Sequence, residues 1–214
     1  MRSSDLLRLS DGVVLRRAGA STLPREDDLR LVVPAGPSPE EPDAPLSIDL
    51  DLAAAGLRRE DVSARLLLVD EDDAAGAVLA AVAGALWTGA DPFAPAERSR
   101  VAGVVTTLAL TWLVPELLRQ TGGRSAVRLA AVLDVWTHLK DSDLSVATIA
   151  RRTGVSERSL YAAFSDGPER LGALLRRLRE DRAAAELESL PERGDVDRTV
   201  ARRWLARPSI AGSA

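Results

Sequence analysis

The clearest hydrophobic pattern in the chain lies between residues 145 and 164, where two short apolar runs at helical spacing are separated by a glycine. Gly154 follows the first run, where a residue that adopts a positive φ without a Cβ penalty can end a helix. Ser156 precedes the second run and can cap it by accepting a hydrogen bond from a backbone N–H near Ser159. The apolar positions are Val146, Ile149 and Ala150 in the first run and Leu160, Ala163 and Phe164 in the second. The pattern predicts helix, tight turn and helix, and it fits a helix-turn-helix unit and an ordinary pair of packed helices equally well.

Residues 1–70 are predicted to form short strands and loops. The runs at 13–16 and 29–33 are apolar and contain β-branched residues, which favours strands, whereas glycine and proline recur between and after them. The acidic, proline-rich segment 34–45 is interpreted as a loop. Two to four such strands are too few to close a barrel, so we expect a small β-element that depends on helices for its stability.

An apolar run that ends in acidic residues follows at 64–73, ARLLLVDEDD. It resembles the start of a response-regulator receiver domain, in which carboxylates bind magnesium. That fold needs a further strand ending in a phosphoacceptor aspartate and a later lysine, but alanine-rich helical segments follow and the only lysine of the chain is Lys140. We therefore interpret residues 70–73 as the cap of the next helix, whose positive N-terminal end they favour.

Two apolar helices are predicted at about 74–88 and 96–120. Segment 101–118 comes closest to a membrane span, but threonines, Pro115 and Glu116 interrupt it. A helix so apolar must have most of its surface covered. We expect it to be buried in the protein and to contribute, at about 97–120, to a homodimer interface.

A domain boundary is predicted at residues 121–125, where two glycines end the apolar segment. Ser125 is expected to cap the next helix, which runs to about Lys140. The chain then divides into an N-terminal region, 1–123, and a C-terminal domain, 124–214. The predicted fold class is mainly α, with a small N-terminal β-element, a helical pair, and a C-terminal bundle that contains the helix-turn-helix pattern and a long helix after it.

Composition narrows the functional classes. The chain has no cysteine and a single histidine, His138, which excludes disulfides, thiolate metal sites and a histidine pair. No nucleophile elbow, phosphate-binding glycine loop or metal-ligand spacing is present, and Asp49 and Asp51 lie in a loop-rich region without basic partners. We therefore predict no enzyme activity, no cofactor and no metal. The N-terminus has no apolar core of the kind a signal peptide needs, so we expect a cytoplasmic protein.

Charge is unevenly distributed along the chain. The net charge is −4, but residues 124–207 hold 16 basic and 13 acidic residues, a balance of +3, which leaves −7 for the remainder. The basic part coincides with the helix-turn-helix pattern. The excess is small and predicts weak attraction to phosphates.

The run LSVATIARRTGVSERSLYAAF, followed by LLRRLREDRAAAEL, resembles the DNA-binding domain of AraC/XylS-type transcription regulators. In that family a first helix-turn-helix is followed by a linker helix with an L-R-x-x-R-L-x-x-A-like pattern and by a second helix-turn-helix. The linker positions that match are Leu175, Arg176, Arg179 and Ala183, with Arg182 a further basic position. The resemblance implies that the N-terminal region is a sensor and dimerisation part, with its strands the remnant of a cupin barrel.

The chain departs from the family pattern in several places: the Gly-x-x-Pro turn before the linker helix is displaced to Gly167-Pro168, Glu180 and Asp181 add negative charge, and two further departures bear on DNA reading. Ala162 stands where the recognition helix usually carries arginine or another polar residue. The segment TVARRWLARPSIAGSA resembles the opening of the second helix-turn-helix, with Ala201, Arg203 and Trp204 as matches, and no recognition helix is predicted after it because Pro208 and Gly212 oppose one. Residues 205–214 are expected to form a disordered tail.

The function we expect is a DNA-binding regulator that reads the major groove through one complete helix-turn-helix. Arg158 is the candidate for bidentate contact with guanine. The residues expected to contact DNA are Arg158, Ser159 and Tyr161 at base edges and Arg151, Arg152 and Ser156 at phosphates. The partners are double-stranded DNA, a second copy of the chain and an effector that the sequence does not identify.

Two alternatives stay open. In the first, the chain is a degenerate family member that acts as a protein-interaction or dimerisation module and binds no DNA. This alternative is favoured by the acidic net charge, by Ala162 and by the incomplete second helix-turn-helix. TetR-type repressors carry a similar I-A-x-x-x-G-V-S-x-x-x-L-Y-x-x-F run, although theirs opens the chain and precedes a large helical domain.

Overall fold

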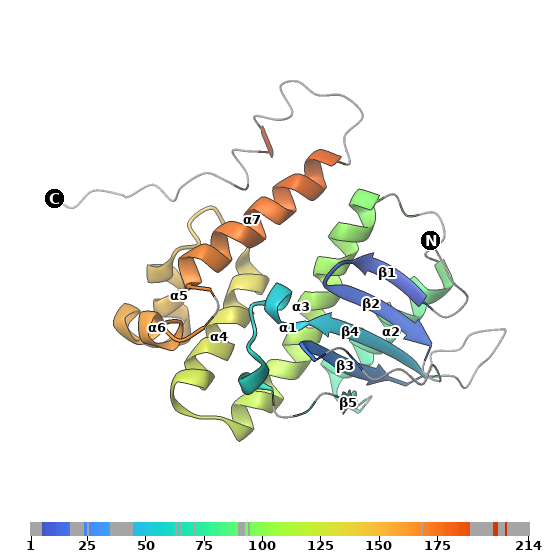
Figure 1. Ribbon diagram of the computed structural model, residues 1–214, viewed down its shortest axis with the longest axis horizontal. Helices are drawn as coiled ribbons and strands as arrows, with labels where there is room; N and C mark the ends of the chain where they lie inside the picture. The colour runs from blue at the N-terminus through green and yellow to red at the C-terminus, as the bar shows by residue number, and fades with distance from the viewer. Residues whose placement is uncertain are drawn as a thin grey trace. The chain divides into compact units, whose positions relative to one another are not determined.

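The computed structural model describes residues 6–17, 24, 26–34, 45–62, 64, 66–70, 72–89, 93, 95–167, 169–188, 199–200 and 204. The chain divides into two compact units, residues 1–120 and 121–214. The first unit contains a small sheet and the second is helical (Figure 1). The coarse prediction of a mainly helical protein with a small N-terminal β-element is confirmed. The predicted loop at 35–44, the tail at 205–214, and Ala201 and Arg203 lie outside the described residues.

The sheet of the first unit has five strands in the order β1-β2-β4-β3-β5. Neighbouring strands are antiparallel except for β3 and β5, which are parallel. The strands are β1 (Leu6–Ser10), β2 (Val13–Arg17), β3 (Asp28–Val33), β4 (Leu46–Asp51) and β5 (Leu66–Leu68). The expectation of two to four strands was too low, because the segment of β4, with Asp49 at its centre, was read as loop, whereas pairing on both of its edges makes it the central strand.

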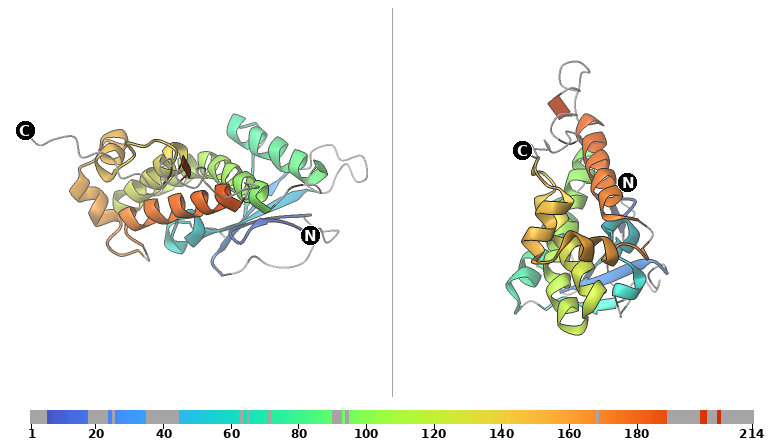
Figure 2. Two further views of the ribbon diagram at one scale, coloured as in Figure 1. Left: turned by 90° about the horizontal axis from the view of Figure 1, so that it is seen from above. Right: turned by 90° about the vertical axis from the view of Figure 1, so that its left-hand side faces the viewer.

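One face of the sheet is apolar and packs against two helices, α2 (Ala74–Gly89) and α3 (Pro95–Gln120). Leu15, Ile48 and Leu31 are neighbours across three strands on this face and are fully buried. Helix α3 contacts β1 and β2 while α2 contacts β3 and β4, so the pair covers the width of the sheet (Figure 2). Sheet and helices therefore share one core, as the sequence required of so small a β-element.

The opposite face of the sheet carries a buried ion cluster centred on Asp49. Its carboxylate accepts from Arg16 Nε at 2.7 Å and from Arg30 Nε at 2.6 Å and Nη2 at 2.9 Å. Hydrogen bonding to Asp49 raises the pKa of Arg30, so the guanidinium stays charged although it is buried. The prediction that Asp49 and Asp51 lie in a loop-rich region was wrong, since both belong to β4, and the expected lack of a basic partner was wrong for Asp49, which stands directly opposite Arg30.

Short helices follow β4. Asp51 caps α1 (Leu52–Ala55), accepting from the Ala54 N–H at 2.8 Å, and Gly56 ends the helix at φ 83°. A 3₁₀ helix, η1 (Arg59–Asp61), comes next. Asp51 lies at the junction of β4 and α1, where its carboxylate caps the backbone of the helix.

The acidic residues after β5 cap α2, as predicted. Asp73 Oδ2 accepts from the Gly76 N–H at 3.1 Å, and the Asp73 carbonyl accepts from the Ala77 N–H at 2.9 Å. The helix also lies very close to the segment that precedes it: a Cβ at Gly76 would lie 2.0 Å from the backbone oxygen of Asp70. Glycine is thus required there by the close approach of two backbones.

Helix α3 is the apolar helix that the sequence singled out. Among the described residues, Glu97–Gln120 is the one helix long and apolar enough to cross a membrane by length and composition, and half of its most apolar window is buried. Leu110 and Leu113 are fully buried, whereas Val104 is 54% exposed. The helix therefore has both a core face and an exposed face.

The named helices described in the second unit are α4 (Gly123–His138), α5 (Val146–Thr153), α6 (Glu157–Ala163) and α7 (Leu171–Glu188). The expectation that Ser125 caps α4 was wrong. The chain enters the helix through Gly123 at φ 59°, so the N-cap is Gly122 and Ser125 lies within the first turn. The helix ends two residues before Lys140.

Gly76→Ala should lower the free energy of unfolding by about 1–3 kcal/mol, the usual cost of forcing an extra carbon into a packed site. The matched control is Gly89→Ala on the same helix, where an added Cβ meets nothing within 4 Å. Chemical denaturation followed by far-ultraviolet circular dichroism measures both. Equal effects of the two substitutions would contradict the close approach at Asp70.

Candidate nucleic-acid interface

The α5–α6 pair is built from local capping signals. Ser145 caps α5: its Oγ accepts from the Thr148 N–H at 3.3 Å, and its own N–H donates to Thr148 Oγ1 at 2.8 Å. Gly154 ends α5 at φ 71°, and Ser156 Oγ accepts from the Ser159 N–H at 3.1 Å to start α6. The left-handed glycine and the serine cap lie where the sequence predicted them, so the turn between the helices is fixed by backbone and hydroxyl groups of the turn itself.

The inner faces of the pair are anchored on α4. Ile149 and Ala150 of α5 and Leu160 of α6 are buried, and both helices contact α4. Phe164 at the end of α6 is buried as well. All were expected at core positions from their helical spacing, so the outer faces of both helices are left to solvent.

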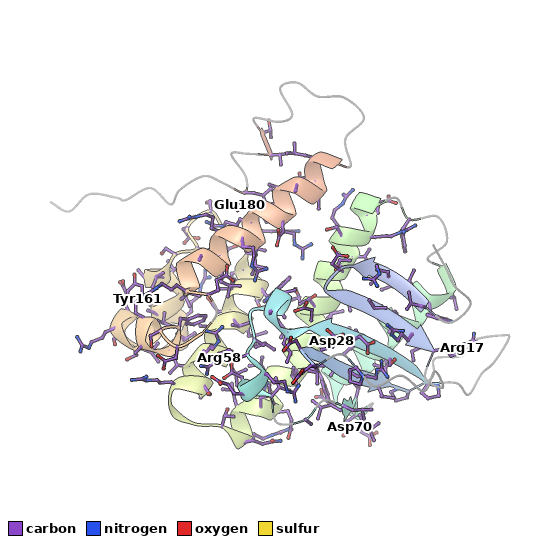
Figure 3. All side chains as sticks on the ribbon, in the orientation of Figure 1. Arg17, Asp28, Arg58, Asp70, Tyr161 and Glu180 are labelled. Atoms are coloured by element: carbon purple, nitrogen blue, oxygen red, sulfur yellow. The ribbon has the colours of Figure 1, made fainter. Side chains whose placement is uncertain are left out.

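The outer face of the pair carries the residues predicted to contact DNA. Tyr161 is 53% exposed and projects from α6 (Figure 3), three residues after Arg158, so the two share one face of the helix. Arg151 on α5 is exposed. Ser156 and Ser159 are exposed too, but their hydroxyls lie 2.8 Å apart and hydrogen bond to each other. Arg158, Arg151 and Tyr161 are therefore the side chains of the predicted set best placed to reach a partner.

Arg152, predicted to hold a phosphate, points to acidic residues of its own unit. Its Nη2 lies 3.1 Å from Asp141 Oδ2 and its Nη1 lies 3.8 Å from Asp134 Oδ2. Asp134 also contacts His138, with Nδ1 3.1 Å from Oδ1, and burial raises the pKa of the Asp134 carboxyl. These acids were missed because nothing in the sequence spacing relates residues 134 and 141 to position 152.

Two of the linker-pattern arginines of α7, Arg179 and Arg182, point towards other parts of the unit, whereas Arg176 is exposed. Arg179 Nη2 donates to the backbone oxygens of Asp141 at 2.9 Å and Leu144 at 3.3 Å, and burial lowers the pKa of Arg179. The Arg182 guanidinium lies over the Trp136 ring, 5.7 Å from its centroid. Both arginines therefore join α7 to α4 and to the loop after it.

A third buried arginine, Arg128, was not recognised in the sequence. It is 1% exposed on α4, and its guanidinium lies over the Phe164 ring at 4.3 Å, a cation–π contact beneath the end of α6. A Cβ at Gly167 would lie 2.8 Å from Arg128 Nη1, so only glycine fits there without displacing the guanidinium. The signal available in the sequence was Gly167, which stands where a side chain would meet the guanidinium.

Trp204, the one residue described from the expected second helix-turn-helix match, is buried. Its Nε1 donates to Glu186 Oε2 of α7. Val200 is also buried. Both side chains belong to the core of the second unit.

The second unit is thus a helical domain in which the α5–α6 pair exposes its outer face to solvent. No family model, curated protein or solved structure matches the chain. Within the described residues no group of three or more acidic or histidine side chains is placed to hold a metal ion. The argument for function therefore depends on the site itself.

Arg179→Leu should lower the free energy of unfolding by about 1.5–3 kcal/mol, because two backbone carbonyls lose a charged donor. Arg176→Leu on the same helix is the control, since Arg176 is exposed and should change stability by less than about 0.5 kcal/mol. Urea denaturation of both variants is the measurement. A stable Arg179→Leu protein would mean that the bonds to the α4–α5 loop contribute nothing.

Proposed function

We propose that the protein is a sequence-specific DNA-binding transcription regulator of the AraC type, with α5–turn–α6 as its helix-turn-helix and α7 as the linker helix. The observation that carries the proposal is the capped α5–α6 pair, whose inner face is held on α4 while Arg158 and Tyr161 stand on the outer face of α6. A helix of this kind reads base edges in the major groove with side chains near its N-terminal end.

Each exposed side chain has a role that its chemistry suggests. Arg158 donates two hydrogen bonds to the O6 and N7 of a guanine. Tyr161, one turn further along α6, contacts a base edge or a thymine methyl. Arg151, on the preceding helix, holds a phosphate, which adds affinity and salt dependence without sequence information. Glu157, also exposed, opposes phosphates or accepts from a cytosine amine.

The N-terminal unit fits a dimerisation role better than an effector-binding one. In the described residues the apolar face of the sheet is filled by α2 and α3, so it does not line a barrel interior, and we propose no effector site there although the resemblance implies a cupin origin. The exposed Val104 supports the proposal that the outer face of α3 joins two copies of the chain. Two copies would read two half-sites and so compensate for one recognition helix per chain.

A second candidate function is favoured by a separate observation. Val78 on α2 and Val104 on α3 are both about half exposed, and β5 exposes Leu66 and Leu68. Apolar side chains on the surface are typical of protein partners. In this alternative the chain is an interaction module without DNA binding. A TetR-like regulator, the other alternative, would use the same α5–α6 face, but its helix-turn-helix would open the chain instead of lying at residues 145–164.

Selection of random duplex DNA on the purified full chain, followed by titration of the selected operator at several salt concentrations, tests the proposal. A regulator loses affinity steeply as salt rises because bound phosphates release counterions. An interaction module selects no operator and shows no salt-dependent binding.

Arg158→Ala should weaken binding to the selected operator by about ten- to a hundredfold, the range for a bidentate base contact, and should relax specificity at one base pair. Arg170→Ala is the control, because Arg170 is exposed but lies outside the α5–α6 pair. Fluorescence anisotropy with labelled operator measures both. Unchanged affinity in Arg158→Ala would show that α6 is not the reading helix.

A further inference from the structure

Two adjacent arginines of α5 have opposite electrostatic surroundings. Arg151 is exposed and has no ion pair within the described part of the chain. Arg152 faces two carboxylates, Asp141 at 3.1 Å and Asp134 at 3.8 Å, one on each terminal nitrogen. Arg151 can therefore bind an anion more readily than Arg152 can.

The acidic side of this contact is held in place by other parts of the unit. The backbone oxygen of Asp141 accepts from Arg179 Nη2 at 2.9 Å, which fixes the loop that carries the carboxylate. Asp134 lies on α4, is largely buried, and contacts His138 through its other oxygen. An ion pair whose partners are already ordered loses less side-chain entropy than an ordinary surface pair.

The charges around Arg152 determine how strongly this arginine attracts a nucleic-acid phosphate. One guanidinium and two carboxylates give the group Arg152, Asp134 and Asp141 a formal charge of −1. The two carboxylates therefore offset the attraction of Arg152 for an approaching phosphate. The guanidinium can hold an anion only after its Nη2 leaves Asp141, which its long, rotatable side chain permits.

We propose that Asp141 is an intramolecular competitor for Arg152, a carboxylate latch that withholds a second phosphate contact on α5 until the arginine exchanges Asp141 for a nucleic-acid phosphate. This inference rests on the proposed DNA-binding function and describes how phosphate binding at the α5–α6 surface is regulated. Removing the latch should strengthen binding, whereas loss of an ordinary structural ion pair would leave it unchanged or weaken it.

Asp141→Asn tests the latch, with Asp143→Asn as the matched control. Both substitutions remove one negative charge from the same loop, but Asp143 is exposed, and in the described part of the chain its side chain makes no ion pair; its backbone oxygen accepts from Thr148 Oγ1. Relative to Asp143→Asn, Asp141→Asn should bind the selected operator about two- to fivefold tighter, the factor that corresponds to an exposed ion pair.

Two further measurements separate the possible outcomes. In an Arg152→Gln background, Asp141→Asn should give no gain over Asp143→Asn, because the competing group is gone. Equal effects of the two aspartate substitutions, or weaker binding by Asp141→Asn, would overturn the latch.

The salt concentration that elutes each variant from immobilised heparin, a polyanion without bases, is measured in parallel. If the wild-type chain selects no operator, the proposed function fails; later elution of Asp141→Asn than of Asp143→Asn would then still support the latch, and equal elution would overturn it.

Discussion

The arrangement of the second unit depends on the bonds from Arg179 to the backbone oxygens of Asp141 and Leu144. These two carbonyls belong to the loop that leads from α4 into α5, and Leu144 directly precedes the Ser145 cap. A charged donor from α7 therefore sets where α5 begins. Arg128 on α4 fixes the other end of the α5–α6 pair, because its guanidinium stacks on Phe164 and holds the end of α6 against α4. Between these two anchors the outer face of the pair is presented as a rigid surface.

Buried charge organises the first unit by the same physical rule. Asp49 lies on the central strand and satisfies its carboxylate with guanidiniums from the strands on both sides, Arg16 on β2 and Arg30 on β3. Breaking a buried pair by removing one partner typically costs about 3–5 kcal/mol, because the remaining charge stays uncompensated. The polar face of the sheet is thus held together by complementary charge, while α2 and α3 bury the apolar face.

Elements encoded by local signals could be predicted from the sequence, whereas those defined by distant partners could not. Gly154 and Ser156 act on the backbone within a few residues, so the turn between α5 and α6 was readable in advance, as was the capping role of Asp73. Strand β4 was missed because Asp49, at its centre, is a residue type that opposes strands unless a partner such as Arg30 compensates it. The same limit applies to the candidate site. Arg158 and Tyr161 were correctly expected to be exposed, but the acids that restrain Arg152 are 11 and 18 residues away and became visible only when α4 and α5 packed together.

These arrangements change what the net charge of the chain implies about binding. A balance of +3 over residues 124–207 would suggest a weakly basic surface, but Arg128, Arg179 and Arg182 are directed into the core or onto other helices, and Arg152 is paired with acids. Charge that is buried or paired adds little to the attraction of phosphates, so the effective basic surface of the α5–α6 pair is smaller than the count suggests. Under the proposed function, base recognition through Arg158 and Tyr161 would then have to provide most of the discrimination between DNA sites. Because one short recognition helix gives few base contacts, specificity would have to be multiplied by joining two chains, which makes the exposed face of α3 as important to the proposed function as α6 itself.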